Sequence, residues 1–203
     1  VGDNVGRGAV FALSSGAPFT VIGMEGGLLA APTSVTAITL GPGERADVVI
    51  DFAPHPAGTE ILLLNSAPAP FPGQAGVGVI PNVMKFRVTA TPGHTAAVPA
   101  SLRPFTPLSE AAATVNREFH LEKGPADACS PYHWRITSIV NGAPVGHMWH
   151  DMTEFPQLGT TEIWNFVNLS GVTHPMHVHL VMFQVLDRQA FEEIQSAPRP
   201  VHP

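Results

Sequence analysis

Apolar and polar residues alternate over short stretches of this chain, which is the pattern of strands in a sheet. Met84, Phe86 and Val88 alternate with Lys85 and Arg87, so one face of this stretch is apolar and the other polar. Similar short runs, divided by turn-forming Gly and Pro residues, predict strands at Phe19–Ile22, Ser34–Leu40, Ala46–Phe52, Glu60–Leu64 and Asn82–Thr89. Strands at this spacing favour a β-sandwich or barrel.

Strand character returns in the second part of the chain, after a proline-rich stretch. Residues 91–109 contain four prolines and no lasting periodicity, which indicates a linker or an extended crossover. Further strands are predicted at Arg117–Leu121, His133–Val140, Glu162–Val167 and Val178–Leu186, and short helices only at Glu110–Val115 and Phe191–Gln195. We therefore expect an all-β protein with one domain over residues 1–91, a linker over 92–110 and a second domain over 111–203.

Composition excludes several classes of partner. Charged residues make up 13% of the 203-residue chain and hydrophobic residues 44%, so the chain can build a core but has little charge to solvate long helices. The net charge of −6 comes without a basic block, which argues against nucleic-acid binding. We expect no membrane-spanning segment and no secretory signal in Val1–Phe11. One cysteine excludes a disulfide framework, and the compartment stays open.

Three histidines near the C-terminus carry the chemistry. They are His174, His177 and His179, in a run that reads Thr-His-Pro-Met-His-Val-His-Leu. On a strand, residues two apart point to the same side, so His177 and His179 should project together. Pro175 should end the strand, so that the side chain of His174 points in a different direction from those of His177 and His179. Three imidazoles in six residues, beside an apolar run, are more readily explained by metal coordination than by packing or by a solvated strand end.

Spacing alone leaves the metal open. Imidazole suits zinc, copper, iron and nickel. A metallo-hydrolase usually has an Asp directly after its His-x-His pair, whereas Leu180 follows here, and the helical His-Glu-x-x-His motif is absent. A redox metal is therefore the leading prediction. A zinc hydrolase stays a minor alternative, since a hydrolase needs a general base and none accompanies the histidines.

The sequence resembles the multicopper oxidases, in particular the branch of bacterial spore-coat laccase, bilirubin oxidase and phenoxazinone synthase. His174–Leu180 resembles their His-Pro-x-His-x-His segment, and Phe183–Arg188 and Gly159–Phe166 are similar to the stretches that flank it. Ile22–Leu29 and Leu40–Phe52 resemble the middle domain of that family. The resemblance extends over most of the chain.

That resemblance implies cupredoxin-like Greek-key β-sandwich domains, the second one incomplete. Residues 1–91 would be a middle domain that lacks its N-terminal part, and residues 111–203 the truncated start of a C-terminal domain. It also implies copper of types 1, 2 and 3, with phenolic or aminophenolic substrates and dioxygen as partners. By position, His174 is a type 1 ligand at the point of electron entry, His177 a type 2 ligand and His179 a type 3 ligand.

The chain also departs from the family pattern. The family's later His-Cys-His segment and the His-x-His pairs of its first domain have no counterpart here. We therefore expect this chain alone to lack oxidase activity. The alternative is a non-catalytic copper-binding or assembly module, whose missing ligands come from another chain.

Other candidate ligands fit less well. Cys129 precedes the histidine motif, whereas the family's ligand Cys follows it. His147 and His150 follow the Asn141-Gly142 turn signal and are interpreted as solvated loop residues. Structural or surface roles are expected for the remaining candidates: His55, His94, His120, His133, His202, Met148, Met152, Met176 and the Glu44-Arg45 and Asp47 stretch.

Overall fold

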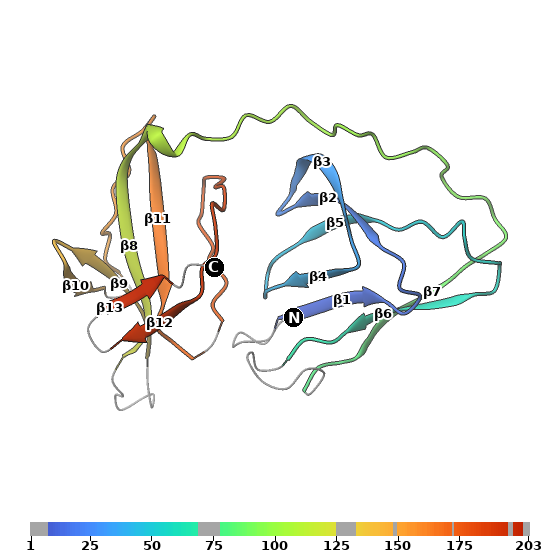
Figure 1. The fold of residues 1–203 in the computed structure, drawn as a ribbon, viewed down its shortest axis with the longest axis horizontal. Coiled ribbons are helices and arrows are strands. Elements are labelled where there is room, and N and C mark those ends of the chain that lie inside the picture. Colours follow the sequence, from blue (N-terminus) through green and yellow to red (C-terminus); the bar gives the residue numbers. More distant parts are fainter. Residues whose placement is uncertain are drawn as a thin grey trace. The chain divides into compact units, whose positions relative to one another are not determined.

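The computed structural model describes residues 8–68, 78–124, 133–147, 150–171, 173–194 and 197–200. Its contacts divide the chain into two compact units (Figure 1). The first unit contains the residues up to Phe105 and a short segment with His174 and Pro175, and the second contains Thr106–Gly171 and the residues from Met176 onward. Each unit is described by itself.

The first unit is built from two antiparallel sheets. One sheet has the order β4-β1-β6-β7 and the other the order β3-β2-β5. The strands are β1 (Ala9–Leu13), β2 (Phe19–Met24), β3 (Gly27–Val35), β4 (Ala37–Leu40), β5 (Ala46–Val49), β6 (Glu60–Asn65) and β7 (Asn82–Arg87). All five strands predicted for this part of the chain are present, and the stretch expected at 34–40 contains the end of β3 and all of β4.

The core of the first unit contains side chains from both sheets. Phe19 of β2 is 2% exposed and packs with Leu13 of β1 and Ile61 of β6. Along β2 every second residue is buried, as expected for a strand with one face on the core. Partly buried aromatic and aliphatic residues surround this cluster, among them Phe11, Phe52 and Phe86.

Two turns of this unit follow directly from their residues. Glu25 and Gly26 join β2 to β3 with φ angles of 53° and 84°, so both central residues are left-handed, as in a type I′ hairpin turn. Gly43 has a φ of 83° and follows Pro42, and the amide of Glu44 donates to the carbonyl of Gly41 at 3.1 Å. Pro followed by a left-handed Gly is the combination that a type II turn requires.

The second unit contains a four-stranded mixed sheet of order β10-β9-β8-β11 and a two-stranded sheet. Its strands are β8 (Ala113–Gly124), β9 (His133–Val140), β10 (Ala143–Gly146), β11 (Thr161–Asn168), β12 (Phe191–Ile194) and β13 (Ala197–Pro200). Strands β8 and β9 are antiparallel, whereas β8 and β11 are parallel. Strand β9 begins and ends where the sequence predicted.

Packing on this sheet centres on an aromatic cluster. Phe119 of β8 is buried and lies 5.1 Å, between ring centroids, from both Trp164 and Phe166 of β11. Arg117 of β8 forms an ion pair with Glu162 of β11 on the same side of the sheet. Both contacts join the two parallel strands, and β11 leads into the histidine segment.

Both predicted helices are wrong. Glu110–Ala112 forms a single 3-10 turn, and β8 begins at Ala113, inside the predicted helix. Phe191–Ile194 is strand β12, which pairs with β13. Short segments have weak intrinsic preferences, so hydrogen bonding to a neighbouring strand decides their conformation.

The stretch between β7 and the 3-10 turn contains no strand or helix, as the proline content predicted. Near its end it is hydrogen-bonded to β3: the amide of Leu102 donates to the carbonyl of Ala30 at 2.9 Å, and Arg103 Nε donates to the carbonyl of Leu28 at 2.5 Å. In the part of the chain that the structure describes, no helix has the length and apolar composition that a membrane span requires.

Candidate functional site

The segment from residue 173 to residue 190 is not part of any sheet, which corrects the strand predicted at Val178–Leu186. His177 and His179 are nevertheless close together, since their ring centroids lie 4.8 Å apart with the rings nearly perpendicular. Both side chains are exposed. The His-x-His spacing thus places two imidazoles side by side without the strand from which we had expected this arrangement.

His174 lies in the first unit, whereas His177 and His179 lie in the second. Its neighbour Pro175 is close to the β4–β5 turn, because a Cβ built on Gly41 would lie 3.6 Å from Pro175 Cγ. His174 is half-buried, and this burial lowers its pKa below the ordinary value of 6.5. The neutral imidazole is the form that coordinates metals.

The donors fit part of a copper centre and not a complete one. Two adjacent exposed imidazoles are suitable ligands for copper. Among the residues that the structure describes, however, no group of three or more His, Cys, Asp or Glu side chains is placed to hold a metal ion. Cys129, Met148 and His202 lie outside the described residues.

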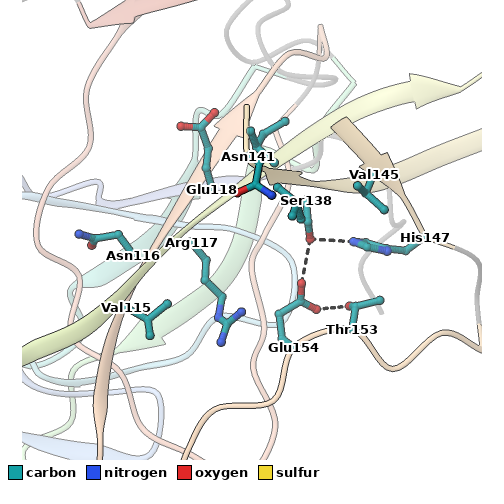
Figure 2. A pocket seen from close by; sticks show the side chains of 12 residues that line it. Val115, Asn116, Arg117, Glu118, Ser138, Asn141, Val145, His147, Thr153 and Glu154 are labelled. Carbon is teal, nitrogen blue, oxygen red and sulfur yellow. Dashed lines mark hydrogen bonds between the residues drawn. The ribbon is translucent and has the colours of Figure 1, made fainter. Parts of the chain in front are cut away.

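A second polar cluster lies on the β9 strand, next to a groove of about 460 Å³ (Figure 2). The hydroxyl of Ser138 donates to Glu154 Oε1 at 2.8 Å, and His147 Nε2 lies 2.7 Å from the same hydroxyl. Thr153 donates to the other carboxylate oxygen of Glu154. The groove is lined by Val115, Asn116, Arg117, Glu118, Ser138, Ile139, Val140, Asn141, Val145, His147, Thr153 and Glu154.

This cluster corrects the interpretation of His147 as a solvated loop residue, whereas His150 is exposed as expected. Because Ser138 gives its only proton to Glu154, His147 must donate its Nε2 proton to Ser138. A serine nucleophile would need the reverse polarity, with the hydroxyl donating to the imidazole. The cluster therefore attaches the loop before β11 to the sheet and does not form a catalytic triad.

Ser138 and Glu154 were not singled out from the sequence, and no short motif links them. They are sixteen residues apart and meet only because the loop folds back onto β9. Other polar residues outside this cluster make local contacts, in keeping with the structural or surface roles that we expected for them. Glu44 accepts the Gly41 amide at 2.6 Å, Arg45 pairs with Glu25, and His120 contacts Glu118 at 2.8 Å.

Comparison with known proteins gives consistent matches. The model of a family described as multicopper oxidase matches residues 113–202. A laccase of Bacillus subtilis is 35% identical over 195 residues, covering 89% of this chain and 33% of the laccase. Multicopper oxidase LPR2 of Arabidopsis thaliana is 33% identical over 182 residues, covering 89% of this chain and 30% of that protein. The chain thus spans about a third of the length of these relatives.

Solved structures support the same fold. The crystal structure of the McoA multicopper oxidase from Aquifex aeolicus has a TM-score of 0.66 and 30% identity, and the match covers 89% of this chain and 39% of McoA. The prediction of an all-β, cupredoxin-like architecture is therefore confirmed.

Proposed function

Because this chain belongs to the multicopper oxidase family, we propose that it is the copper-binding part of a laccase-like oxidase. The chemistry that copper supplies in such an oxidase is one-electron oxidation of phenolic or aminophenolic substrates, coupled to reduction of dioxygen to water. The observation that carries the proposal is the pair of exposed imidazoles at His177 and His179, with ring centroids 4.8 Å apart, inside the His-Pro-x-His-x-His motif.

Each histidine would have a different role. His177 would bind the type 2 copper and His179 a neighbouring type 3 copper, since two adjacent rings can serve two adjacent metals. His174, with Pro175 between it and the pair, would bind the type 1 copper and mark the point of electron entry. In domain terms, residues 1–91 would be part of the middle cupredoxin-like domain, joined by residues 92–110 to the start of the C-terminal one over 111–203.

Copper binding by site-directed variants tests this proposal. The double variant His177→Ala/His179→Ala should bind Cu²⁺ at least about tenfold more weakly than the unchanged chain, because even changes behind the metal ligands cost that much. His55→Ala/His94→Ala removes two histidines outside the motif and serves as the matched control, which should keep its affinity. The proposal would be contradicted if the two double variants took up copper equally. It would also be contradicted if a variant lacking all three motif histidines took up as much copper as the unchanged chain.

A copper-binding or assembly module without catalysis of its own is the second candidate. It is favoured because the described residues offer no complete metal centre within this chain. The remaining ligands would then come from another polypeptide, and the assembled species would be larger than the chain alone. Size-exclusion chromatography with and without copper distinguishes this module from an independent monomer.

A further inference from the structure

We infer that the turn formed by residues 41–44, between β4 and β5, supports Pro175 and thereby positions the imidazole of His174. Two residues of this turn carry the role: Gly41, which lies against the ring of Pro175, and Glu44, which holds Gly41 in place. Both are positioning residues and not copper ligands. This inference rests on the proposed function, because the position of His174 matters for the oxidase only if His174 binds copper.

The 41–44 turn is closed by two hydrogen bonds between the same two residues. The amide of Glu44 donates to the carbonyl of Gly41 at 3.1 Å, and the amide of Gly41 donates to Glu44 Oε2 at 2.6 Å. Both polar groups of the Gly41 backbone are therefore bonded to Glu44, and a bond to a charged carboxylate is roughly twice as strong as one between neutral groups. Pro42 and the left-handed Gly43 favour the same turn, so it is well formed without help from Pro175.

Pro175 packs against Gly41 at a distance that leaves room for one methyl group. A Cβ built on Gly41 would lie 3.6 Å from Pro175 Cγ and 3.4 Å from Glu44 Oε2, which are ordinary van der Waals separations. A β-branched side chain adds two further carbons to that Cβ and would have to displace Pro175 or the Glu44 carboxylate. The contact lies within the first unit, to which both Gly41 and Pro175 belong.

Holding Pro175 also restricts His174, because a proline ring limits the chain on both of its sides. The ring fixes its own φ at about −65°, and it confines the preceding residue to extended backbone conformations. Few conformations therefore remain for His174 once the ring is held. His174 is half-buried and belongs to the first unit, whereas His177 and His179 are exposed and belong to the second. The first unit thus determines the position of His174 separately from that of the pair.

The position of His174 has a consequence for copper, because a metal is bound best by ligands that are already in place. A side chain that is held beforehand loses less entropy when the metal binds. Residues that orient a ligand from behind are accordingly worth about 10–100-fold in metal affinity. Loss of the 41–44 turn should therefore release the imidazole of His174 and weaken any copper binding that depends on it.

NMR of the copper-free chain tests the contact itself. Gly41→Ala adds a methyl group beside Pro175, and alanine fits the backbone because the φ of Gly41 is not left-handed. The methyl protons should show a nuclear Overhauser effect to the ring protons of Pro175, since the two carbons would be 3.6 Å apart. Gly93→Ala is the matched control, because a Cβ there meets no atom within 4 Å, and its methyl should show no such effect to Pro175.

Carbethoxylation by diethyl pyrocarbonate tests the support of His174. The reagent modifies accessible neutral imidazoles, and mass spectrometry locates the product on each histidine. The pH is set about one unit above the ordinary histidine pKa, so that imidazoles are mostly neutral. Gly41→Val should raise the rate at His174 at least about twofold, because a released segment loses its burial, whereas Gly41→Ala should leave it unchanged. His55 is half-buried in the same unit, and its rate should stay constant in both variants.

A conservative variant tests the role of Glu44. Glu44→Ala removes the bond to Gly41 and should raise the carbethoxylation rate at His174. Glu44→Gln keeps an oxygen that can accept the Gly41 amide, so the rate should stay close to that of the unchanged chain. Asp51→Ala is the matched control, since Asp51 accepts the amide of Ala53 at 2.9 Å in another loop of the same unit. It should not change the rate at His174.

The inference is overturned if Gly41→Ala shows no Overhauser effect to Pro175, or if Gly41→Val and Glu44→Ala leave the reactivity of His174 unchanged. An equal increase at His55 would assign the turn to the stability of the whole unit and would overturn the inference as well. Added Cu²⁺ separates this inference from the proposed function. If the copper-free results are as expected but Cu²⁺ does not protect His174 from the reagent, the support by the turn stands and the proposed ligand role of His174 is contradicted.

Discussion

Arg117 and Glu162 form a bidentate ion pair between the parallel strands β8 and β11. Arg117 Nε donates to Glu162 Oε2 at 2.7 Å, and a terminal guanidinium nitrogen donates to Oε1 at 3.0 Å. The indole of Trp164 donates to the same carboxylate at 2.8 Å. The Glu162 side chain is only 8% exposed. This carboxylate therefore joins the first strand of the second unit to the strand that leads into the histidine motif.

Glu162→Gln should destabilise the chain by about 1.5–3 kcal/mol, because it removes charge-assisted hydrogen bonds from a nearly buried group. Urea unfolding monitored by tryptophan fluorescence measures the change. Glu118→Gln, which alters a carboxylate that is 47% exposed on the same strand, is the control and should cost less than about 1 kcal/mol. An equal loss of unfolding free energy in both variants would show that the ion pair with Arg117 contributes no more to stability than an exposed carboxylate does.

Stability should depend on the ionisation of Glu162. The hydrogen bond from Arg117 holds the pKa of this carboxyl below its usual value of 4.5. A lowered pKa means that the unfolded state binds more protons, so this contribution is complete above pH 4.5 and is lost as the pH falls through the folded-state value. The unfolding free energy of Glu162→Gln should therefore fall less steeply below pH 4.5 than that of the unchanged chain. Parallel pH profiles would contradict this assignment.

His174 should titrate below its usual value because burial disfavours its charged form. Between the folded-state pKa and 6.5 the unfolded chain binds more protons at this position, so stability should decrease as the pH falls through this range. Imidazole proton resonances followed by NMR against pH give the pKa directly, and His174→Ala assigns the resonance. A midpoint at or above 6.5 would show that the side chain is solvated.

Gly142→Ala should destabilise the β9–β10 hairpin by about 1–2 kcal/mol, because alanine resists the left-handed conformation. Gly142 has a φ of 77° and follows Asn141, whose φ is 52°. Gly171→Ala is the matched control, since a Cβ there meets no atom within 4 Å and its φ is not left-handed. Thermal unfolding of the two variants compares them, and equal midpoints would contradict the role assigned to the turn.

The chain alone, loaded with copper, should not be intensely blue and should not oxidise a phenolic dye. A type 1 centre needs two imidazoles and a thiolate, and the described residues hold no group of three metal-binding side chains. Visible absorption and dye turnover measure both properties, with Bacillus subtilis laccase as the positive control. A blue and active monomer would show that the chain contains a complete set of ligands.

Local features of this protein could be predicted from its sequence. The turn at Asn141-Gly142 and the bounds of the strand at His133–Val140 were both correct. So was the proximity of His177 and His179, although the strand expected to cause it is absent. A turn depends on the backbone angles of the residues that occupy it, and a His-x-His spacing limits how far apart two rings can lie.

Other features were decided only by tertiary structure. The apolar run at 178–186 resembles a strand but pairs with no other strand among the residues that the structure describes, whereas Phe191–Ile194 resembles a helix but pairs with β13. The parallel pairing of β8 with β11 and the contact between Ser138 and Glu154 join segments that are distant in sequence. Strand pairing and burial depend on which distant segments come together. Adjacent residues do not determine this, whereas they do determine the angles of a turn.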